Sequence, residues 1–365
     1  AGGEVTLLHP DAKHYTLVHK SETLQSNQTC RLELPWGRVL SAKAVPVDQE
    51  TGGRCWNAAI NLEKYIGNYQ SDPVFQKVGL TTYNQKRFFT YNTKKILNWT
   101  APEGNWEIHC FLEEEIDDFK YYGTFVDPCN AEAIKTFIEL THERYAKNLG
   151  EEFGKTVKGI FTDETGLLGR IPWSPRLLDF FQQLNGYDLR DCLHTLVEPE
   201  GEDTTKVRYD YFQSIHLLLR ESYHKQIHDW CEEQGIQYVA EVPSVRMSNQ
   251  IYSHIPGGDS AHEKLGRSLE WILTRYMTSF RANPKMVSSL ANQLRRERAL
   301  IESFHSVGWS MTLQDAKWML DRLASFGINF FNFHAFFYTL DGLTKHDAPP
   351  SQFFQNPYWQ HFRQL

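Results

Sequence analysis

Carboxylate and imidazole side chains recur at the ends of short apolar segments in the second two-thirds of the sequence. These segments read GIFTDE, QYVAEV, NQIYSHIPGGD, LIESFHSVGW and FFNFHAFFY. Charged groups are costly to bury unless they converge on a site, so their recurrence after successive segments predicts a shared site. The candidate residues at the segment ends are Asp163, Glu164, Glu241, His254, Asp259, Glu302, His305, Trp309, His334 and Tyr338.

Two carboxylates that face each other across a pocket, with aromatic rings beside them, have the groups that glycoside hydrolysis requires. One acid protonates the departing oxygen, and the other activates water or attacks the anomeric carbon. Aromatic rings offer flat apolar faces to the C–H groups of a sugar, while His and Asp side chains hydrogen-bond its hydroxyls. The competing chemistry is metal-dependent hydrolysis with His254, Asp259 and His334 as ligands, although no HxH or HExxH spacing supports it.

Each candidate also has a purely structural explanation when it is taken alone. Glu164 could cap a helix, and Glu241 could pair with Arg246. Asp259, which follows Pro-Gly-Gly, could be a turn residue. The recurrence of such residues after five successive segments is what favours a site over these separate explanations.

The segments that precede the apolar runs have helical periodicity, and they occupy residues 128–149, 206–234, 284–298 and 312–327. Repeated helix-then-strand units imply parallel strands with helical crossovers, and continuous apolar strands imply that both faces are covered. A doubly wound sheet would normally carry a glycine-rich phosphate loop, but no GxGxxG or Walker sequence follows any strand. The pattern therefore favours an α/β barrel, in which the carboxyl ends of the strands carry the active site.

The first 126 residues have a different pattern. Short β-rich runs alternate there with Gly, Pro, Asn and Asp clusters, which is typical of an antiparallel β unit. These runs occupy residues 4–8, 15–19, 38–47, 87–91 and 106–112. We therefore predict two regions, a β-rich unit over 1–126 and a (β/α) barrel region over 127–365.

Composition excludes several other classes. The 365 residues have a formal net charge of −7, which argues against nucleic acid as the main partner. No apolar run of 18 residues predicts a membrane span, and the six cysteines form no CxxC pair. The absence of a visible signal sequence and of paired cysteines predicts a cytoplasmic location. Aromatic residues make up 14% of the chain, which predicts rings in a pocket as well as in the core.

Four long stretches resemble the barrel of bacterial glycoside hydrolases of the α-L-rhamnosidase type, glycoside hydrolase family 106 and its close relatives. They begin NAEAIKTFIEL, IPGGDSAHEKLG, IESFHSVGWSM and GINFFNFHAFFY, and the similarity runs from about Asp127 to the C-terminus. The resemblance implies a (β/α)8 barrel of the TIM type and an exo-acting, inverting glycosidase that releases α-linked L-rhamnose or a similar deoxysugar. It also implies that this chain contains strands four to eight only, preceded by an inserted β unit over residues 1–126.

The resemblance also implies roles for individual residues. Glu164, after strand four, corresponds to the general acid, and Glu302, after strand seven, to the general base. We expect Phe161 and Trp173 to give Glu164 a hydrophobic neighbourhood that raises its pKa. Relatives can use calcium near the sugar, so the resemblance allows a calcium site, whose ligands it does not assign, but makes no cofactor certain. The residues expected to shape the sugar pocket are Asp163, Trp173, Glu241, His254, Asp259, His305, Trp309, His334 and Tyr338. The alternative function is a carbohydrate-binding remnant without catalysis.

Overall fold

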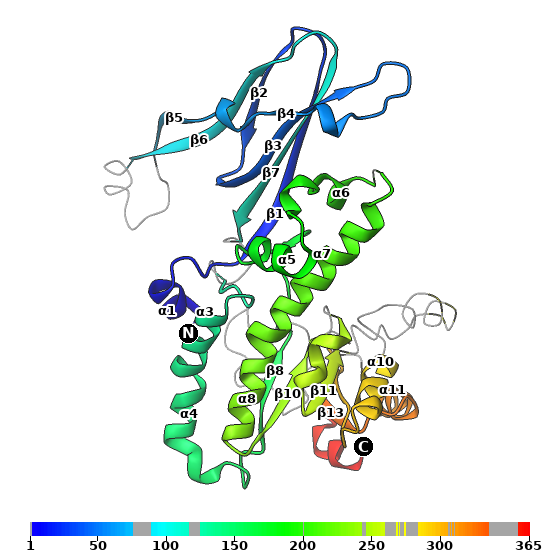
Figure 1. Ribbon diagram of the computed structural model, residues 1–365. Helices are drawn as coiled ribbons and strands as arrows, with labels where there is room; N and C mark the ends of the chain where they lie inside the picture. Colours follow the sequence, from blue (N-terminus) through cyan, green and yellow to red (C-terminus); the bar gives the residue numbers. More distant parts are fainter. Residues whose placement is uncertain are drawn as a thin grey trace.

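The structure is a computed structural model of the 365-residue chain. It describes residues 2–75, 89–116, 125–199, 201–242, 246–259, 268, 270, 274, 284–305, 307, 309, 311–335 and 357–365. Figure 1 shows an elongated molecule, with antiparallel strands at one end, helices in the middle and a parallel sheet toward the other end.

Two antiparallel sheets form the β-rich end of the molecule. Five strands lie in the order β4-β3-β7-β1-β9, and three lie in the order β2-β6-β5. Their buried side chains form one core, centred on residues such as Leu97, Trp99 and Ile108. The strands are β1 (Tyr15–Leu24), β2 (Thr29–Leu34), β3 (Gly37–Val47), β4 (Ile60–Asn61), β5 (Ile66–Phe75), β6 (Phe89–Thr100), β7 (Asn105–Glu115) and β9 (Pro172–Trp173), with 3-10 turns η1 (Trp56–Ala58) and η2 (Glu63–Tyr65).

Strand β9 comes from the second predicted region but pairs with the first. Trp173 lies opposite Tyr15 on β1 in antiparallel register. The side chain of Trp173 is buried in a large core that also contains residues of β1 and of the central helices. The two predicted regions therefore share a sheet and a core at this point.

The second region contains a five-stranded parallel sheet in the order β8-β10-β11-β12-β13, which is also the order along the chain. The strands are β8 (Gly159–Asp163), β10 (Gln237–Glu241), β11 (Ile255–Asp259), β12 (Leu300–Ser303) and β13 (Phe330–Phe333). Residues of both the first and the last strand line one hollow of about 530 Å³, so the sheet is curled. The five strands predicted from the sequence are confirmed, and within the described residues they form a curled, open half-barrel sheet rather than a closed barrel.

Helices separate these strands and cover their outer face (Figure 1). The sequence signals at their ends work as expected, since Asn130 accepts a hydrogen bond from the N–H of Ala133 and Thr312 forms a capping box with Asp315. The helices and turns of this region are α3 (Ala131–Leu140), α4 (His142–Leu149), η3 (Gly150–Glu152), α5 (Leu177–Asn185), η4 (Leu189–Asp191), α6 (His194–Val197), α7 (Thr204–Leu219), the π turn η5 (Arg220–His224), α8 (Lys225–Glu233), η6 (Met247–Tyr252), α10 (Pro284–Gln293), α11 (Leu313–Ser325) and η9 (Trp359–Gln364).

One strand prediction is wrong. Residues 4–8 lie within a helix, α1 (Gly2–Leu8), and not in a β-run. Val5 of this helix packs with Ala12 and with Ala133 of α3, and this contact favours the helix. A five-residue run such as EVTLL is too short for its periodicity to distinguish a strand from a helix.

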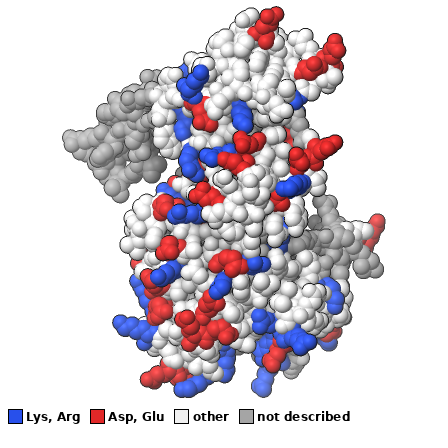
Figure 2. Space-filling view, viewed as in Figure 1, with Lys and Arg blue, Asp and Glu red and all other residues white. Residues whose placement is uncertain are grey.

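The surface carries both signs of charge. Figure 2 shows lysine and arginine side chains interspersed with aspartate and glutamate over the visible face. In the part of the chain that the structure describes, no helix has the length and apolar composition that a membrane span needs.

Candidate active site

The parallel register of the curled sheet brings the carboxylates predicted from the sequence together. Asp163 on β8 lies opposite Glu241 on β10, and Asp259 on β11 lies opposite Glu302 on β12. Asn332 on β13 continues the row opposite Glu302. Paired residues of parallel strands point to the same face, so one edge of the sheet carries a row of polar side chains.

An apolar row lies directly below this polar row. Val239, Ile255 and Leu300 form a small buried cluster with Phe330 packed against it. Each of these strands thus presents an apolar residue and, two or more positions further on, a polar residue. Apolar filling beneath a polar rim at the carboxyl end is the layering of side chains inside α/β barrels.

The carboxylate oxygens approach each other closely. Oxygens of Asp163, Glu241 and Glu302 lie within 4.8 Å of one another, and so do oxygens of Glu164, Glu241 and Asp259. We call these five residues the carboxylate cluster. Glu241 belongs to both groups and is therefore the centre of the cluster.

Glu241 is the most constrained member. Its side chain is fully buried, and among the described residues neither carboxylate oxygen accepts a hydrogen bond from an N–H or hydroxyl donor. Burial raises the pKa of Glu241 well above its ordinary value, and the neighbouring negative charges of Glu302 and Asp259 raise it further. A buried carboxylate without donors requires either a proton or a cation.

Glu302 has a similar environment. It is almost completely buried, and burial raises its pKa, as do the charges of Asp259 and Asp163. His305 and His334 lie beside it, with their rings 4.6 Å apart in an edge-to-face arrangement. One ligand-type atom from each of these three residues lies within a common distance of 4.8 Å.

Glu164 lies on the loop that leaves β8. Its backbone has a φ of 43°, in the left-handed region that residues other than glycine adopt at a cost. The side chain is exposed, and it lines a cavity of about 560 Å³ together with Phe137, Leu168 and Tyr223. The loop therefore presents this carboxylate at the rim of the cluster, where a ligand can reach it.

Most of the site residues predicted from the sequence meet here. Asn332 was not predicted, although its place in FFNFHAF puts it two residues after Phe330 and therefore on the same face of the strand. Trp309 follows β12 with half of its surface exposed, and its role in the pocket stays a prediction. Tyr338 lies outside the described residues. The predicted residues that the structure brings together are Asp163, Glu164, Glu241, Asp259, Glu302, His305 and His334.

The prediction that Trp173 lines the sugar pocket is wrong. Its side chain has no exposed surface, and the indole Nε1 donates a hydrogen bond of 3.0 Å to Glu113 Oε2. Because β9 turns away from the parallel sheet to pair with β1, Trp173 packs in the core between the two regions. Trp173 is not among the residues that line the cavity beside Glu164, and the raised pKa expected for Glu164 stays a prediction.

Truncation of Trp173 should therefore destabilise the fold. We expect Trp173→Ala to lower the free energy of unfolding by about 3–5 kcal/mol, the usual cost of removing a buried indole. Trp36→Ala, which removes a mostly exposed indole, should cost less than about 1 kcal/mol. Urea unfolding of both variants measures the difference, and equal losses would show that Trp173 is not a core residue.

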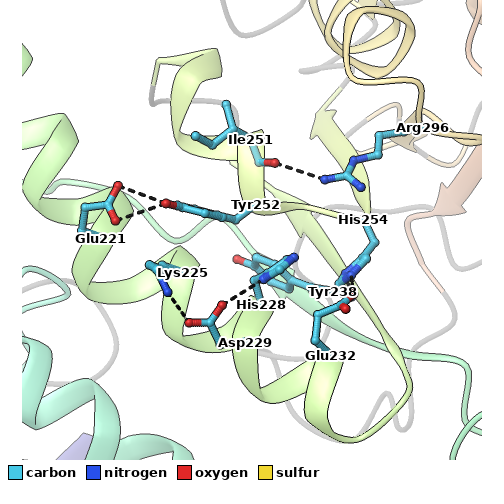
Figure 3. Close-up of polar contacts among 10 residues, drawn as sticks. All are labelled: Glu221, Lys225, His228, Asp229, Glu232, Tyr238, Ile251, Tyr252, His254 and Arg296. Carbon is cyan, nitrogen blue, oxygen red and sulfur yellow. Dashed lines mark hydrogen bonds and ion pairs between the residues drawn. The ribbon is translucent and has the colours of Figure 1, made fainter.

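His254 also lies away from the carboxylate cluster. It directly precedes β11, at the amino end of the sheet, where its Nε2 lies 2.5 Å from Glu232 Oε1 on α8 (Figure 3). Its Nδ1 accepts a hydrogen bond from the backbone N–H of Tyr238. The sequence placed His254 and Asp259 in one segment. His254 precedes β11 and Asp259 ends it, so the two residues lie at opposite ends of the strand. The pocket assignment of His254 is therefore wrong.

Ligand-type atoms also gather around His254. His228 and Glu232 are one turn apart on α8, and with His254 they form a group whose ligand atoms lie within 4.8 Å (Figure 3). The two imidazole rings are stacked nearly parallel, at 9°, so they cannot both direct a lone pair at one ion. Because His254 Nδ1 accepts the N–H of Tyr238, its proton is on Nε2, the atom that a metal would need. The geometry favours a histidine–glutamate hydrogen bond over a metal site.

Comparisons with known proteins agree with this architecture. A protein of Formosa agariphila, provisionally named a beta-glucuronidase, is 24% identical over an alignment of 363 positions, which covers 90% of this chain and 29% of that protein. The solved structure of a rhamnosidase from Novosphingobium sp. PP1Y matches with a TM-score of 0.53 and 15% identity, over 89% of this chain and 46% of that one. This chain thus spans less than half of either protein, and the second likeness shows the fold alone.

The family assignment comes from a separate comparison. The model of glycoside hydrolase family 106, described as alpha-L-rhamnosidase, matches residues 90–340. The matched range contains β8, β10, β11, β12 and β13 and every member of the carboxylate cluster. Since it covers more than half of the 365 residues, the chain belongs to glycoside hydrolase family 106, the alpha-L-rhamnosidase family.

Proposed function

We propose that this chain forms the catalytic region of a glycoside hydrolase that removes a terminal α-linked L-rhamnose or a similar deoxysugar. The observation that carries the proposal is the convergence of Glu164 and Glu302, from different strands, on one carboxylate cluster at the carboxyl edge of a curled parallel sheet. We infer that this sheet belongs to an eight-stranded barrel, which the likeness to the rhamnosidase fold supports.

Glu164 is our general acid and Glu302 our general base. The exposed Glu164 borders a cavity in which a leaving group can lie, and its proton passes to the glycosidic oxygen as the bond to the anomeric carbon breaks. The buried Glu302 accepts a proton from the attacking water. Water attack on the face opposite the leaving group inverts the anomeric configuration, which is the outcome we propose.

The carboxylate cluster also fits a divalent cation. Glu241 is fully buried without an N–H or hydroxyl donor among the described residues, and hard oxygen ligands of this kind suit calcium. Glu241 would hold the ion together with Asp163 or with Asp259, whose oxygens each lie within 4.8 Å of an oxygen of Glu241, and Glu302 or Glu164 borders the same group. When bound, calcium would neutralise part of the cluster and coordinate sugar hydroxyls.

The release of L-rhamnose tests the proposal directly. The chain should hydrolyse p-nitrophenyl α-L-rhamnoside faster than the corresponding β-D-glucuronide, which represents the name of the Formosa relative. Proton NMR of the first product formed should show the β-anomer, as inversion requires. Hydrolysis of neither glycoside would overturn the proposed activity for this chain, while initial release of the α-anomer would overturn inversion alone.

A carbohydrate-binding role without catalysis is the second candidate. It is favoured by the sheet edges, because β8 and β13 are each paired on one side only within the described residues. Calorimetric titration with methyl α-L-rhamnoside distinguishes the two candidates, since binding without product release supports this one. A metal hydrolase, with Glu302, His305 and His334 as ligands, would instead lose all activity when divalent ions are removed.

A further inference from the structure

A chain of buried side chains connects the central helix to the loop that carries Glu164. Helices α7 and α8 are joined by the π turn η5, which supplies Tyr223 and His224, both buried. Single π turns inside α-helices occur often at functional sites, since the extra residue redirects the side chains that follow. Tyr223 and His224 point from this turn toward β8 and β10, because Tyr223 contacts Thr162 of β8 and His224 contacts Tyr238 of β10.

The contacts form a continuous series. His224 Nδ1 lies 2.8 Å from the hydroxyl of the fully buried Tyr238 on β10. Thr162, the buried residue before Asp163, lies beside Tyr238 and has its Oγ1 3.5 Å from the Tyr223 hydroxyl. The hydroxyl of Thr165 donates to the same Tyr223 oxygen at 3.3 Å. One phenolic oxygen thus contacts the residues on both sides of the Asp163–Glu164 pair.

The contacts of the Tyr223 hydroxyl with Thr162 and Thr165 lie next to the strained part of the loop after β8. Glu164 has the left-handed φ of 43°, and such conformations persist only where neighbouring contacts hold them. Thr162 and Thr165 are the residues that flank the strained segment, and Tyr223 contacts both. Tyr223 also lines the cavity that Glu164 borders, so its ring limits how far the loop can move into that space.

We propose that Tyr223 is a positioning residue for Glu164. Tyr223 holds the loop after β8 so that the carboxyl group of Glu164 lies next to the leaving oxygen. The inference rests on the proposed function of Glu164 as general acid. A general acid must lie within hydrogen-bond distance of the oxygen that it protonates, so a loop that is free to shift loses this step first. The hydroxyl of Tyr223, rather than its ring, carries the effect.

Leaving groups of different basicity isolate the acid step. The alkoxide of an alkyl rhamnoside must be protonated as the glycosidic bond breaks. The dinitrophenolate of a dinitrophenyl rhamnoside is a weak base and leaves without protonation. We expect Tyr223→Phe to lower kcat/KM on the alkyl substrate by about 10- to 100-fold and on the dinitrophenyl substrate by less than about threefold. Glu164→Gln should show the same dependence in stronger form. Tyr187→Phe removes a hydroxyl that donates a hydrogen bond to Asp210 elsewhere in the chain. Its kcat/KM should show no such dependence on the leaving group.

A readout without turnover accompanies the kinetics. Amide hydrogen exchange over residues 160–168 should be faster in Tyr223→Phe than in the unsubstituted chain or in Tyr187→Phe, while exchange in α3 stays unchanged. If Glu164→Gln lacks the leaving-group dependence, the proposed role of Glu164 as general acid fails. If Glu164→Gln shows it but Tyr223→Phe shows neither it nor faster exchange, the positioning inference fails. Faster exchange that extends through α3 as well would assign Tyr223 a general role in stability and overturn the inference too.

Discussion

Glu302→Gln should lower kcat on rhamnosides by about 10³- to 10⁴-fold while substrate binding persists, because the amide cannot accept the proton of the attacking water. The effect should be as large on a dinitrophenyl rhamnoside as on an alkyl rhamnoside, since water attacks in both reactions. Glutamine keeps the shape of glutamate, so the buried position next to β13 should remain packed. Initial rates measure the loss of kcat, and calorimetric titration with methyl α-L-rhamnoside measures whether binding persists.

The pH profile gives an independent signature of the same residue. Burial and the charges of Asp259 and Asp163 raise the pKa of Glu302, and a general base works only when ionised. In the cation-free chain, the acidic limb of kcat/KM should therefore lie at a higher pH than the ordinary glutamate pKa of about 4.3, with activity lost as pH falls through it. This limb should disappear in Glu302→Gln.

A matched control separates the carboxylate from its neighbourhood. Glu297 is exposed near the opposite end of β12, so Glu297→Gln should keep the activity and the pH profile of the unsubstituted chain. Added azide, which attacks without losing a proton, should restore part of the turnover of Glu302→Gln on the dinitrophenyl substrate. Near-full activity of Glu302→Gln without azide would contradict the assignment of the base.

The parallel sheet could be predicted from local patterns because four of its five strands, all except β11, obey several rules at once. Apolar runs such as GIFTD follow a helix with a recognisable end, and a polar residue closes each run. Parallel register then follows from the helical crossovers, and the register alone places Asp163 beside Glu241 and Asp259 beside Glu302. The cluster was therefore accessible from the sequence.

Other features depend on contacts between distant segments, which no local pattern records. The two residues of β9 pair with β1 more than 150 positions away, and this pairing buries Trp173. His254 lies at the amino end of its strand, because β11 begins only at Ile255. The role that we propose for Tyr223 could not be predicted from the sequence either. It depends on a π turn and on contacts of the hydroxyl with Thr162 and Thr165, about 60 positions earlier in the chain.

The charge of Glu241 should make the cation-free chain less stable as pH rises. Burial and neighbouring carboxylates raise the pKa of Glu241 in the folded state, so the folded chain retains a proton that the unfolded chain releases above a pH of about 4.3. The stability associated with that proton is complete below this pH and is lost progressively as pH rises toward the folded-state pKa. A cation bound to the ionised carboxylate would reverse the loss, and its affinity should increase with pH because binding displaces the proton.

Glu241→Gln should therefore be more stable than the unsubstituted chain at pH 8 in EDTA, by roughly 1 kcal/mol or more, because the neutral amide is buried without taking up a proton and one pKa unit corresponds to about 1.4 kcal/mol. Calcium should raise the Tm of the unsubstituted chain at this pH more than the Tm of Glu241→Gln, because the variant has only a neutral oxygen at the central position. Glu139→Gln, on an exposed position of α3, should behave like the unsubstituted chain. Thermal unfolding at pH 5 and pH 8, with calcium or EDTA, covers all these cases. A Glu241→Gln variant that is less stable at pH 8 in EDTA would show that the carboxylate has a partner that stabilises its charge.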